Sequence, residues 1–295
     1  MTVLRVTHTH TPGALVHFGF GADTAGDVRV ACLRLAGPGG GEAWIGEAAT
    51  DFALMAIQVE EADFDGIEGA SAEAYRRLLA IVRPSAHPYL LRIWNYLGAI
   101  NEGDGDDERY RRFCVGRAAA VDARFNAPPP AATAIGTLWT GSVQVIALCA
   151  REPGIALENP RQTPAWQYPR EYSPVPPGFS RGVLVGEGDG LRLLASGTAS
   201  IVGHVSQHPN DAAAQLRESL ANLEVLLDEG AARSGRCFSL GRCEALRVYL
   251  RDPADLGFVQ TALAGSVPLD RVLFLHGDIC RRELLVELEG VFSAG

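Results

Sequence analysis

At 295 residues the chain is long enough for two domains of about 150 residues each, and 47% hydrophobic with 21% charged residues is typical of a globular protein. All 26 basic residues are arginine, which excludes mechanisms that need a lysine amine, such as Schiff-base aldolases, pyridoxal-phosphate enzymes and P-loop NTPases. The net charge of −9 argues against an extended nucleic-acid surface, so an anionic ligand must be held by local arginines.

The sequence also carries no membrane, export or metal signal. No apolar run reaches the roughly 18 residues that a membrane helix needs, and the N-terminus MTVLRVTHTH lacks a basic region followed by an apolar core. The six cysteines form no CxxC pair, and His8 and His10 alternate on a predicted strand without a third ligand. We therefore expect a cytoplasmic protein with free thiols, no membrane or nucleic-acid partner, no metal and no cofactor.

The first half of the chain predicts strands, helix, strand, helix and strand. Apolar and β-branched runs predict strands at 4–10, 14–21, 28–35, 89–100 and 137–150, and helical spacing predicts helices over 70–82 and 108–125. The acidic turn 101–107 stands where it can cap the second helix.

Residues 151–181 differ in character, because they contain seven prolines. No helix or central strand tolerates that density. Trp166, Tyr168 and Tyr172 are uncommon in a disordered linker. We therefore expect an ordered loop that lies over a cleft.

The second half repeats the order of the first. Strands are predicted at 182–185, 191–195, 198–202, 245–251, 271–275 and 284–292, and helices at 211–232 and 256–263. This order predicts an α+β protein of two similar domains, residues 1–150 and 151–295, each a mixed β-sheet with helices packed on one face. The small residues 196–200, SGTAS, allow either a close approach to a ligand or a tight bend.

The segment 276–290, HGDICRRELLVELEG, combines a thiol, two arginines and three glutamates with a strand-like run. On a strand, Glu287 and Glu289 share one face, while Val286 and Leu288 share the other. This alternation fits a half-buried strand with a solvated charged face as well as it fits a reactive centre. The residues alone leave both interpretations open.

Five stretches resemble the chorismatase family in the same order, from about residue 90 to about residue 290. They read RIWNYLGAIN, ERYRRFCVGRA, ENPRQTPAWQYPREYSPVPPGFSRG, SGTASIVGH and HGDICRRELLVELEG. The resemblance implies two domains similar to the YjgF/Rid imine deaminases and to the AroH-type chorismate mutases. It also implies a monomeric enzyme that acts on chorismate and releases the enolpyruvyl group as pyruvate, since a duplicated chain can build internally the interface that single-domain relatives form between subunits.

The same resemblance implies catalytic roles for two residues. Glu287 matches the acid that protonates the enolpyruvyl methylene. Cys280, seven positions earlier, matches the branch that makes 3-hydroxybenzoate, in which a ring hydroxyl displaces the pyruvyl ether through an arene-oxide-type intermediate. Seven positions put Cys280 and Glu287 on opposite faces of a regular strand, so we predict a turn or bulge near Arg281 and Arg282. A closed apolar cleft would raise the pKa of Glu287.

Chorismate carries two carboxylates, which arginine forks bind well. The predicted substrate-binding residues are Arg117, Tyr168, Arg170, Gly197, Ala199, Arg251 and Arg281. Three alternatives stay open: a hydrolytic chorismatase giving 3,4-dihydroxycyclohexa-1,5-diene carboxylate, a bifunctional 3-/4-hydroxybenzoate synthase, and a Rid-like module that binds small acids without turnover.

Overall fold

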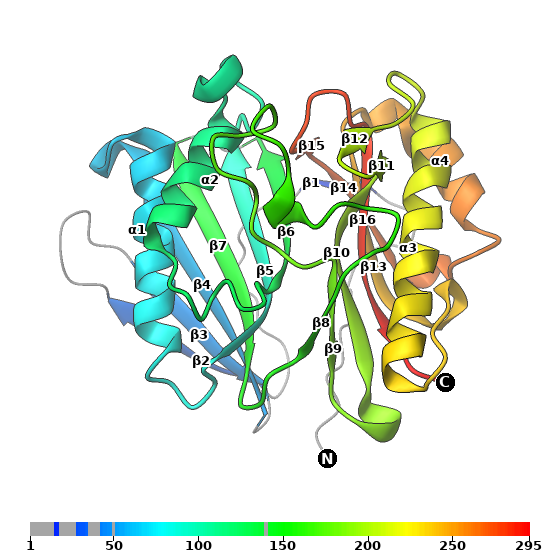
Figure 1. The fold of residues 1–295 in the computed structure, drawn as a ribbon, viewed down its shortest axis with the longest axis horizontal. Helices are drawn as coiled ribbons and strands as arrows, with labels where there is room; N and C mark the ends of the chain where they lie inside the picture. The colour runs from blue at the N-terminus through cyan, green and yellow to red at the C-terminus, as the bar shows by residue number, and fades with distance from the viewer. Residues whose placement is uncertain (1–14, 18–27, 35–41, 49–50, 139–140) are drawn as a thin grey trace.

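The computed structural model describes residues 15–17, 28–34, 42–48, 51–138 and 141–295, with side chains from residue 51 onward. Two seven-stranded sheets pack face to face, and two helices cover the outer face of each sheet (Figure 1). The described chain therefore has four layers, helices, sheet, sheet and helices. The predicted α+β class, with a mixed sheet and helices on one face in each half, is confirmed.

The first sheet has the strand order β15-β6-β5-β7-β4-β3-β2, in which β5 and β6 run parallel and the other neighbours antiparallel. Its elements are β2 (Val28–Arg34), β3 (Glu42–Ala48), β4 (Phe52–Glu60), α1 (Gly66–Val82), β5 (Tyr89–Gly98), α2 (Arg109–Ala120), β6 (Ala131–Thr137), β7 (Ser142–Ala150) and β15 (Asp278–Ile279). Ala70, Ala74 and Leu78 recur every fourth residue of α1, so one apolar stripe packs on the sheet. A side chain at Gly116 of α2 would collide with the Glu68 backbone of α1, so this glycine permits close helix packing.

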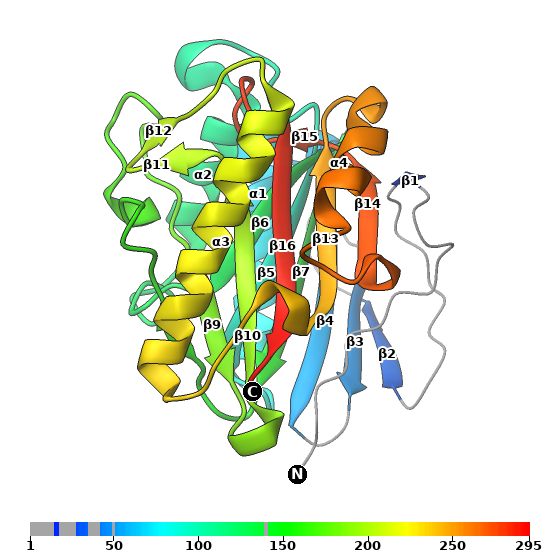
Figure 2. The same ribbon diagram turned by 90° about the vertical axis from the view of Figure 1, so that its right-hand side faces the viewer.

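The second sheet has the order β1-β14-β13-β16-β10-β9-β8. Its elements are β1 (Leu15–His17), β8 (Ile155–Leu157), β9 (Gly182–Val185), β10 (Arg192–Ala199), α3 (Ala212–Ser234), β13 (Cys243–Leu250), α4 (Leu256–Leu263), β14 (Val272–His276) and β16 (Val286–Ser293), with a separate hairpin of β11 (Ile201–Val202) and β12 (Val205–Ser206). Figure 2 shows α3 and α4 lying over this sheet. Asp211 caps α3 by accepting a hydrogen bond from the Ala214 amide, and Gly235 ends α3 with a left-handed φ of 70°.

The two halves of the chain exchange one strand each. β1 pairs with β14 in the second sheet, and β15 pairs with β6 in the first sheet. Each sheet therefore contains one strand from the other half of the chain. The division into two domains, residues 1–150 and 151–295, stays a prediction.

Most predicted elements match the structure. The helices expected at 70–82, 108–125, 211–232 and 256–263 are α1, α2, α3 and α4, and loop 151–181 is ordered, with β8 at the sheet edge. The single strand expected over 137–150 is wrong, because β7 begins at Ser142 and Ala131–Thr137 forms a strand of its own. β4 and β6 are absent from the predicted elements. The run 4–10, with His8 and His10, lies outside the described residues.

Candidate active site

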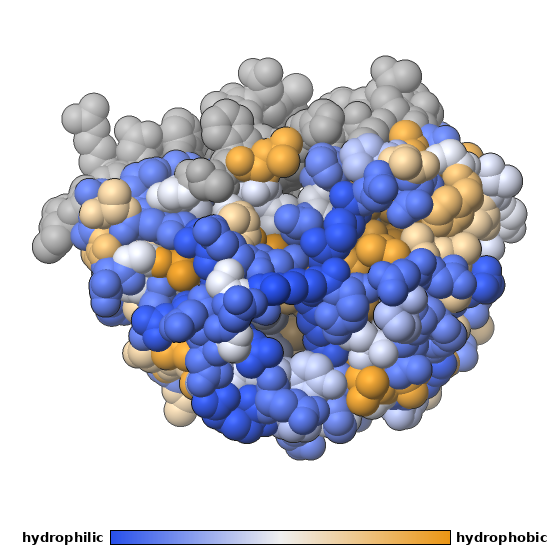
Figure 3. Space-filling model, turned by 90° about the horizontal axis from the view of Figure 1, so that it is seen from above, coloured by the Kyte–Doolittle hydropathy of each residue, from blue (hydrophilic) through white to orange (hydrophobic). Residues whose placement is uncertain are grey.

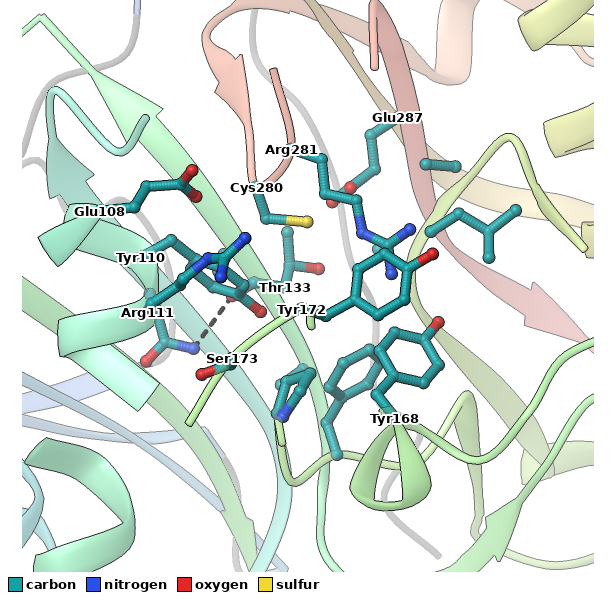
Figure 4. A pocket seen from close by; sticks show the side chains of 18 of the residues that line it. Glu108, Tyr110, Arg111, Thr133, Tyr168, Tyr172, Ser173, Cys280, Arg281 and Glu287 are labelled. Carbon is teal, nitrogen blue, oxygen red and sulfur yellow. Dashed lines mark hydrogen bonds between the residues drawn. The ribbon is translucent and has the colours of Figure 1, made fainter. Parts of the chain in front are cut away.

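A cavity of about 320 Å³ lies between the two sheets, where β6, β10 and β16 meet the loops at one end of the molecule (Figure 4). The face that carries these loops is largely hydrophilic (Figure 3). The described residues that line the cavity are Asn95, Glu108, Tyr110, Arg111, Arg117, Ala132, Thr133, Ala134, Tyr168, Glu171, Tyr172, Ser173, Pro177, Phe179, Arg181, Gly197, Ala199, Ile201, Cys280, Arg281, Arg282, Glu283 and Glu287. Loop 151–181, named here the covering loop, contributes seven of them and so forms part of the cavity wall.

Glu287 projects from β16 into the inner end of the cavity and is only 4% exposed. On the neighbouring strand β10, a side chain at Gly197 would collide with Oε1 of Glu287, so glycine leaves the room that the carboxyl group occupies. Burial, and next the negative charge of Glu289, raise the pKa of Glu287 to about 8, against the opposite effect of Arg92 and Arg181. Glu287 therefore carries a proton at neutral pH.

Glu289 lies two residues further along the same face of β16, is 2% exposed and has the opposite protonation state. Burial alone would raise the pKa of Glu289, but Arg92 and Arg247 together lower it below its usual value. The pair therefore consists of one protonated carboxyl group, which faces the cavity, and one carboxylate, which is held between arginines. Two carboxyl groups whose environments move their pKa values apart are typical of acid–base sites.

Cys280 follows β15, and its sulfur atom points into the cavity (Figure 4). Burial, and next Glu287, raise the pKa of the Cys280 thiol well above its ordinary range, so the thiol is neutral. Residues 280–285 form a turn between β15 and β16, in which the Leu284 amide donates to the Arg281 carbonyl at 3.1 Å. The turn predicted between Cys280 and Glu287 is confirmed, and it brings both residues to one cavity.

Three arginines in the cavity make no salt bridge with a carboxylate among the described residues. Arg281 lies over the Tyr172 ring, 4.0 Å from its centroid, and donates to the His204 carbonyl at 2.8 Å. Arg181 is buried and donates to the Tyr168 hydroxyl at 2.7 Å, and its Nε has no hydrogen-bond partner. Arg117, from α2, is buried with its guanidinium 5.6 Å from the Phe113 ring centroid. Permanently charged forks with spare donors favour an anionic ligand here.

Two predicted binding residues lie elsewhere. The side chain of Arg170 is 63% exposed and forms a two-pronged ion pair with Asp106 at 2.6 and 2.9 Å. Arg251 binds Asp278 at 2.5 Å and donates to the carbonyls of Leu284, Ile279 and Arg281. Neither arginine is among the described residues that line the cavity. Arg170 pairs with a carboxylate at the surface, and Arg251 hydrogen-bonds to the backbone of the 280–285 turn, so other groups engage both side chains.

No group of three histidine, cysteine, aspartate or glutamate residues in the described part of the chain could hold a metal ion. The five cysteines whose side chains the structure describes are free thiols, three of them buried. Of the helices in the same ranges, none is long and apolar enough to cross a membrane.

Comparisons with known proteins identify the family. Residues 40–149 match the family model for the N-terminal part of FkbO/Hyg5-like chorismatases. A chorismatase from Streptomyces rapamycinicus is 39% identical over 233 residues, covering 76% of this chain and 70% of that protein. The chain belongs to the chorismatase family. A 3-hydroxybenzoate synthase from Streptomyces hygroscopicus is 33% identical over 75% of this chain and 68% of its own length. A chorismatase crystal structure superposes with a TM-score of 0.78 at 34% identity, covering 85% of this chain and 77% of the other.

Several cavity residues of this family member are absent from the predicted site. Arg181 stands among the aromatic and proline residues of the covering loop, where no local pattern separates it from the other arginines. Thr133 lies on β6, which was not among the predicted strands, and Tyr110 and Tyr172 come from α2 and the covering loop. Of the predicted residues, the cavity brings together Arg117, Tyr168, Gly197, Ala199, Cys280, Arg281 and Glu287.

Proposed function

We propose that this protein converts chorismate to 3-hydroxybenzoate and pyruvate. The observation that carries the proposal is the joint presence of a protonated Glu287 and a neutral Cys280 thiol in one covered cavity. Membership of the chorismatase family supports the substrate, and the relative named 3-hydroxybenzoate synthase supports the product.

The charges of the cavity suit a substrate with two carboxylates. Arg181 and Arg281 both lie over the Tyr168 ring, with guanidinium-to-centroid distances of 5.6 and 5.2 Å, while Arg117 approaches from α2. We propose that Arg181 and Arg281 bind the enolpyruvyl carboxylate, since Arg181 is close enough to Glu287 to influence its pKa. Arg117 then binds the ring carboxylate. The cavity volume of about 320 Å³ is within the usual range for small-molecule sites.

In the first chemical step, Glu287 donates its proton to the methylene carbon of the enolpyruvyl group. The methylene becomes a methyl group, and positive charge develops at the carbon that carries the ether oxygen. Glu287 becomes a carboxylate, which Arg92 and Arg181 stabilise, because both lower its pKa. An acid that is protonated at neutral pH is needed here, since a vinyl ether is a weak base.

In the second step, the neighbouring ring hydroxyl oxygen attacks the ring carbon that carries the ether, and the hydroxyl proton passes to the Glu287 carboxylate, which restores the acid. The ether bond breaks and its electron pair leaves with pyruvate. The arene oxide formed on the ring then opens, and the ring becomes aromatic as one ring carbon loses a proton and the phenol oxygen gains one. The two products together have the composition of chorismate, so this route consumes no water, whereas the hydrolytic route consumes one. A neutral thiol is a weak hydrogen-bond partner, so Cys280 disfavours a water molecule where the hydrolytic route needs one.

The test is to incubate the purified protein with chorismate, without added metal or cofactor, and to identify products by chromatography with mass detection. We expect 3-hydroxybenzoate with equimolar pyruvate. Cys280→Ala should lose 3-hydroxybenzoate formation and gain the dihydroxycyclohexadiene acid, while Cys237→Ala, which removes an exposed thiol, should match the unaltered protein.

Other products would select among the alternatives. A 4-hydroxybenzoate peak beside the 3-isomer would make the enzyme bifunctional. The dihydroxy acid from the unaltered protein would overturn the product, and binding of chorismate without any pyruvate would favour the Rid-like module.

A further inference from the structure

The carboxylate of Glu289 lies between the two sheets, outside the residues that line the cavity, and receives five hydrogen bonds. Its Oε1 accepts from Arg247 at 2.8 Å, Trp94 at 2.9 Å and Tyr249 at 3.0 Å. Its Oε2 accepts from Arg92 at 2.5 Å and from the Thr133 hydroxyl. Arg92, Trp94 and Thr133 belong to the first sheet and Arg247 and Tyr249 to the second, so the cluster joins both sheets through one side chain.

Stability alone does not account for this cluster. Removing two arginines and a glutamate from water costs several kcal/mol for each charge, and well-packed apolar residues are often as stable as a buried ion pair. The other end of the same interface is built that way, from Leu91, Leu148, Val183 and Leu194. A charged cluster at only one end, next to the cavity, points to a role in the site.

The cluster reaches the cavity through Thr133. Its hydroxyl donates to Glu289, and the same residue forms part of the cavity wall. A Cβ atom built on Gly197 would lie 3.1 Å from Oγ1 of Thr133 and would also collide with Oε1 of Glu287. The Thr133 hydroxyl and the Glu287 carboxyl group therefore flank the same point, and Glu289 lies directly behind them.

We infer that Glu289 is a positioning residue for the acid: its carboxylate, locked between Arg92 and Arg247, holds a fixed negative charge beside Glu287 and so keeps the proton on Glu287. The inference rests on the proposed function, in which Glu287 is the proton donor. Glu289 itself is not among the described residues that line the cavity and acts through its neighbour.

The charged and titratable groups around this pair act in both directions. Those that face Glu289 or Glu287 are Arg92 and Tyr96 on β5, Arg247 and Tyr249 on β13, Tyr110 on α2, Arg181 of the covering loop and Cys280 of the turn. Arg92 and Arg181 favour the ionised form of Glu287. The negative charge of Glu289 acts against them, because it raises the pKa of Glu287. Without the Glu289 charge, burial alone opposes the two arginines, so the pKa of Glu287 should fall.

The decisive experiment is the pH profile of kcat/KM for Glu289→Gln, measured as pyruvate release from chorismate. Glutamine keeps the size of the side chain and removes the charge. The pKa of Glu287 should fall, so the alkaline limb, which we expect near pH 8 in the unaltered protein, should move at least one pH unit lower, with activity retained at acidic pH. Trp94→Phe is the matched control, because it removes a hydrogen bond to Glu289 without changing a charge, lies outside the described residues that line the cavity, and should leave the limb in place.

A second variant keeps the inference testable if Glu289→Gln does not fold. Arg92→Gln removes a positive charge that lowers the pKa of Glu287, while Arg247 still holds Glu289, so the limb should move to higher pH. A uniform loss of activity in both variants, with unmoved limbs, would make the cluster a structural support only and overturn the inference. Absence of pyruvate release from the unaltered protein would instead overturn the proposed function.

Discussion

The two ends of the sheet–sheet interface differ, although one face of β16 runs through both. At the cavity end this face presents Glu287 and Glu289, and two residues later Val291 packs in an apolar cluster with Val183 and Leu194. Apolar burial holds the sheets together at one end. The costly buried charges are confined to the other end, where, in the proposed function, they prepare Glu287 for proton transfer.

The largest effect should come from removing the acid at the polar end. Glu287→Gln keeps the shape of the side chain but cannot donate the proton, so kcat for pyruvate release should fall by about 10²–10⁴-fold. Steady-state kinetics measure the fall, and calorimetric titration with chorismate checks that binding is retained. A variant that retains most of its kcat would exclude Glu287 as the acid.

The matching change at the apolar end should affect stability without affecting the chemistry. Leu194 is 2% exposed, and Leu194→Ala should reduce the free energy of unfolding by about 2–5 kcal/mol through lost burial and a cavity. Denaturant unfolding measures this cost, while the alkaline limb of the activity profile should stay in place. A shifted limb would show that the two ends are coupled, contrary to the division drawn here.

The contrast between the two ends was only partly predictable from the sequence. The alternation along β16 correctly separated Glu287 and Glu289 from Val286 and Leu288, and strand parity correctly required a turn after Cys280. The interpretation of the charged face as solvated is wrong, because a second sheet covers it. Which layer covers a strand depends on contacts far apart in the sequence, such as that between Arg92 and Glu289.

The arginines illustrate the same limit. Arg117, Arg170, Arg251 and Arg281 are equivalent as sequence candidates, since each has the same charge and reach. Their separation depends on which carboxylates the fold places nearby, and Asp106 and Asp278 engage two of the four. Helices were easier to predict, because the apolar spacing of α3 and its Asp211 cap are local features.

The polar end should also make stability depend on pH. Because burial and Glu289 raise the pKa of folded Glu287 from 4.5 to about 8, the stability contributed by the neutral form is complete below pH 4.5 and is lost as pH rises toward 8. Glu287→Gln should therefore gain stability relative to the unaltered protein over this range, by on the order of 3 kcal/mol at neutral pH. Denaturant unfolding at several pH values measures the difference in free energy of unfolding between this variant and the unaltered protein. Glu224→Gln, at an exposed position, is the control. If this difference in free energy of unfolding did not change with pH, Glu287 would ionise as an ordinary carboxyl group.

The smallest effect should come from the surface above the polar end. Arg170 and Asp106 are both well exposed, so Arg170→Ala should change the free energy of unfolding by less than about 1 kcal/mol and leave KM for chorismate unchanged. Arg281→Ala is the matched comparison, because its guanidinium lies in the cavity over Tyr172, and loss of a charge-assisted hydrogen bond worth about 1.5–3 kcal/mol should raise KM by about 10–100-fold. A raised KM for Arg170→Ala would mean that the covering loop turns this arginine inward when substrate binds, and would extend the charged region from the buried cluster to the surface.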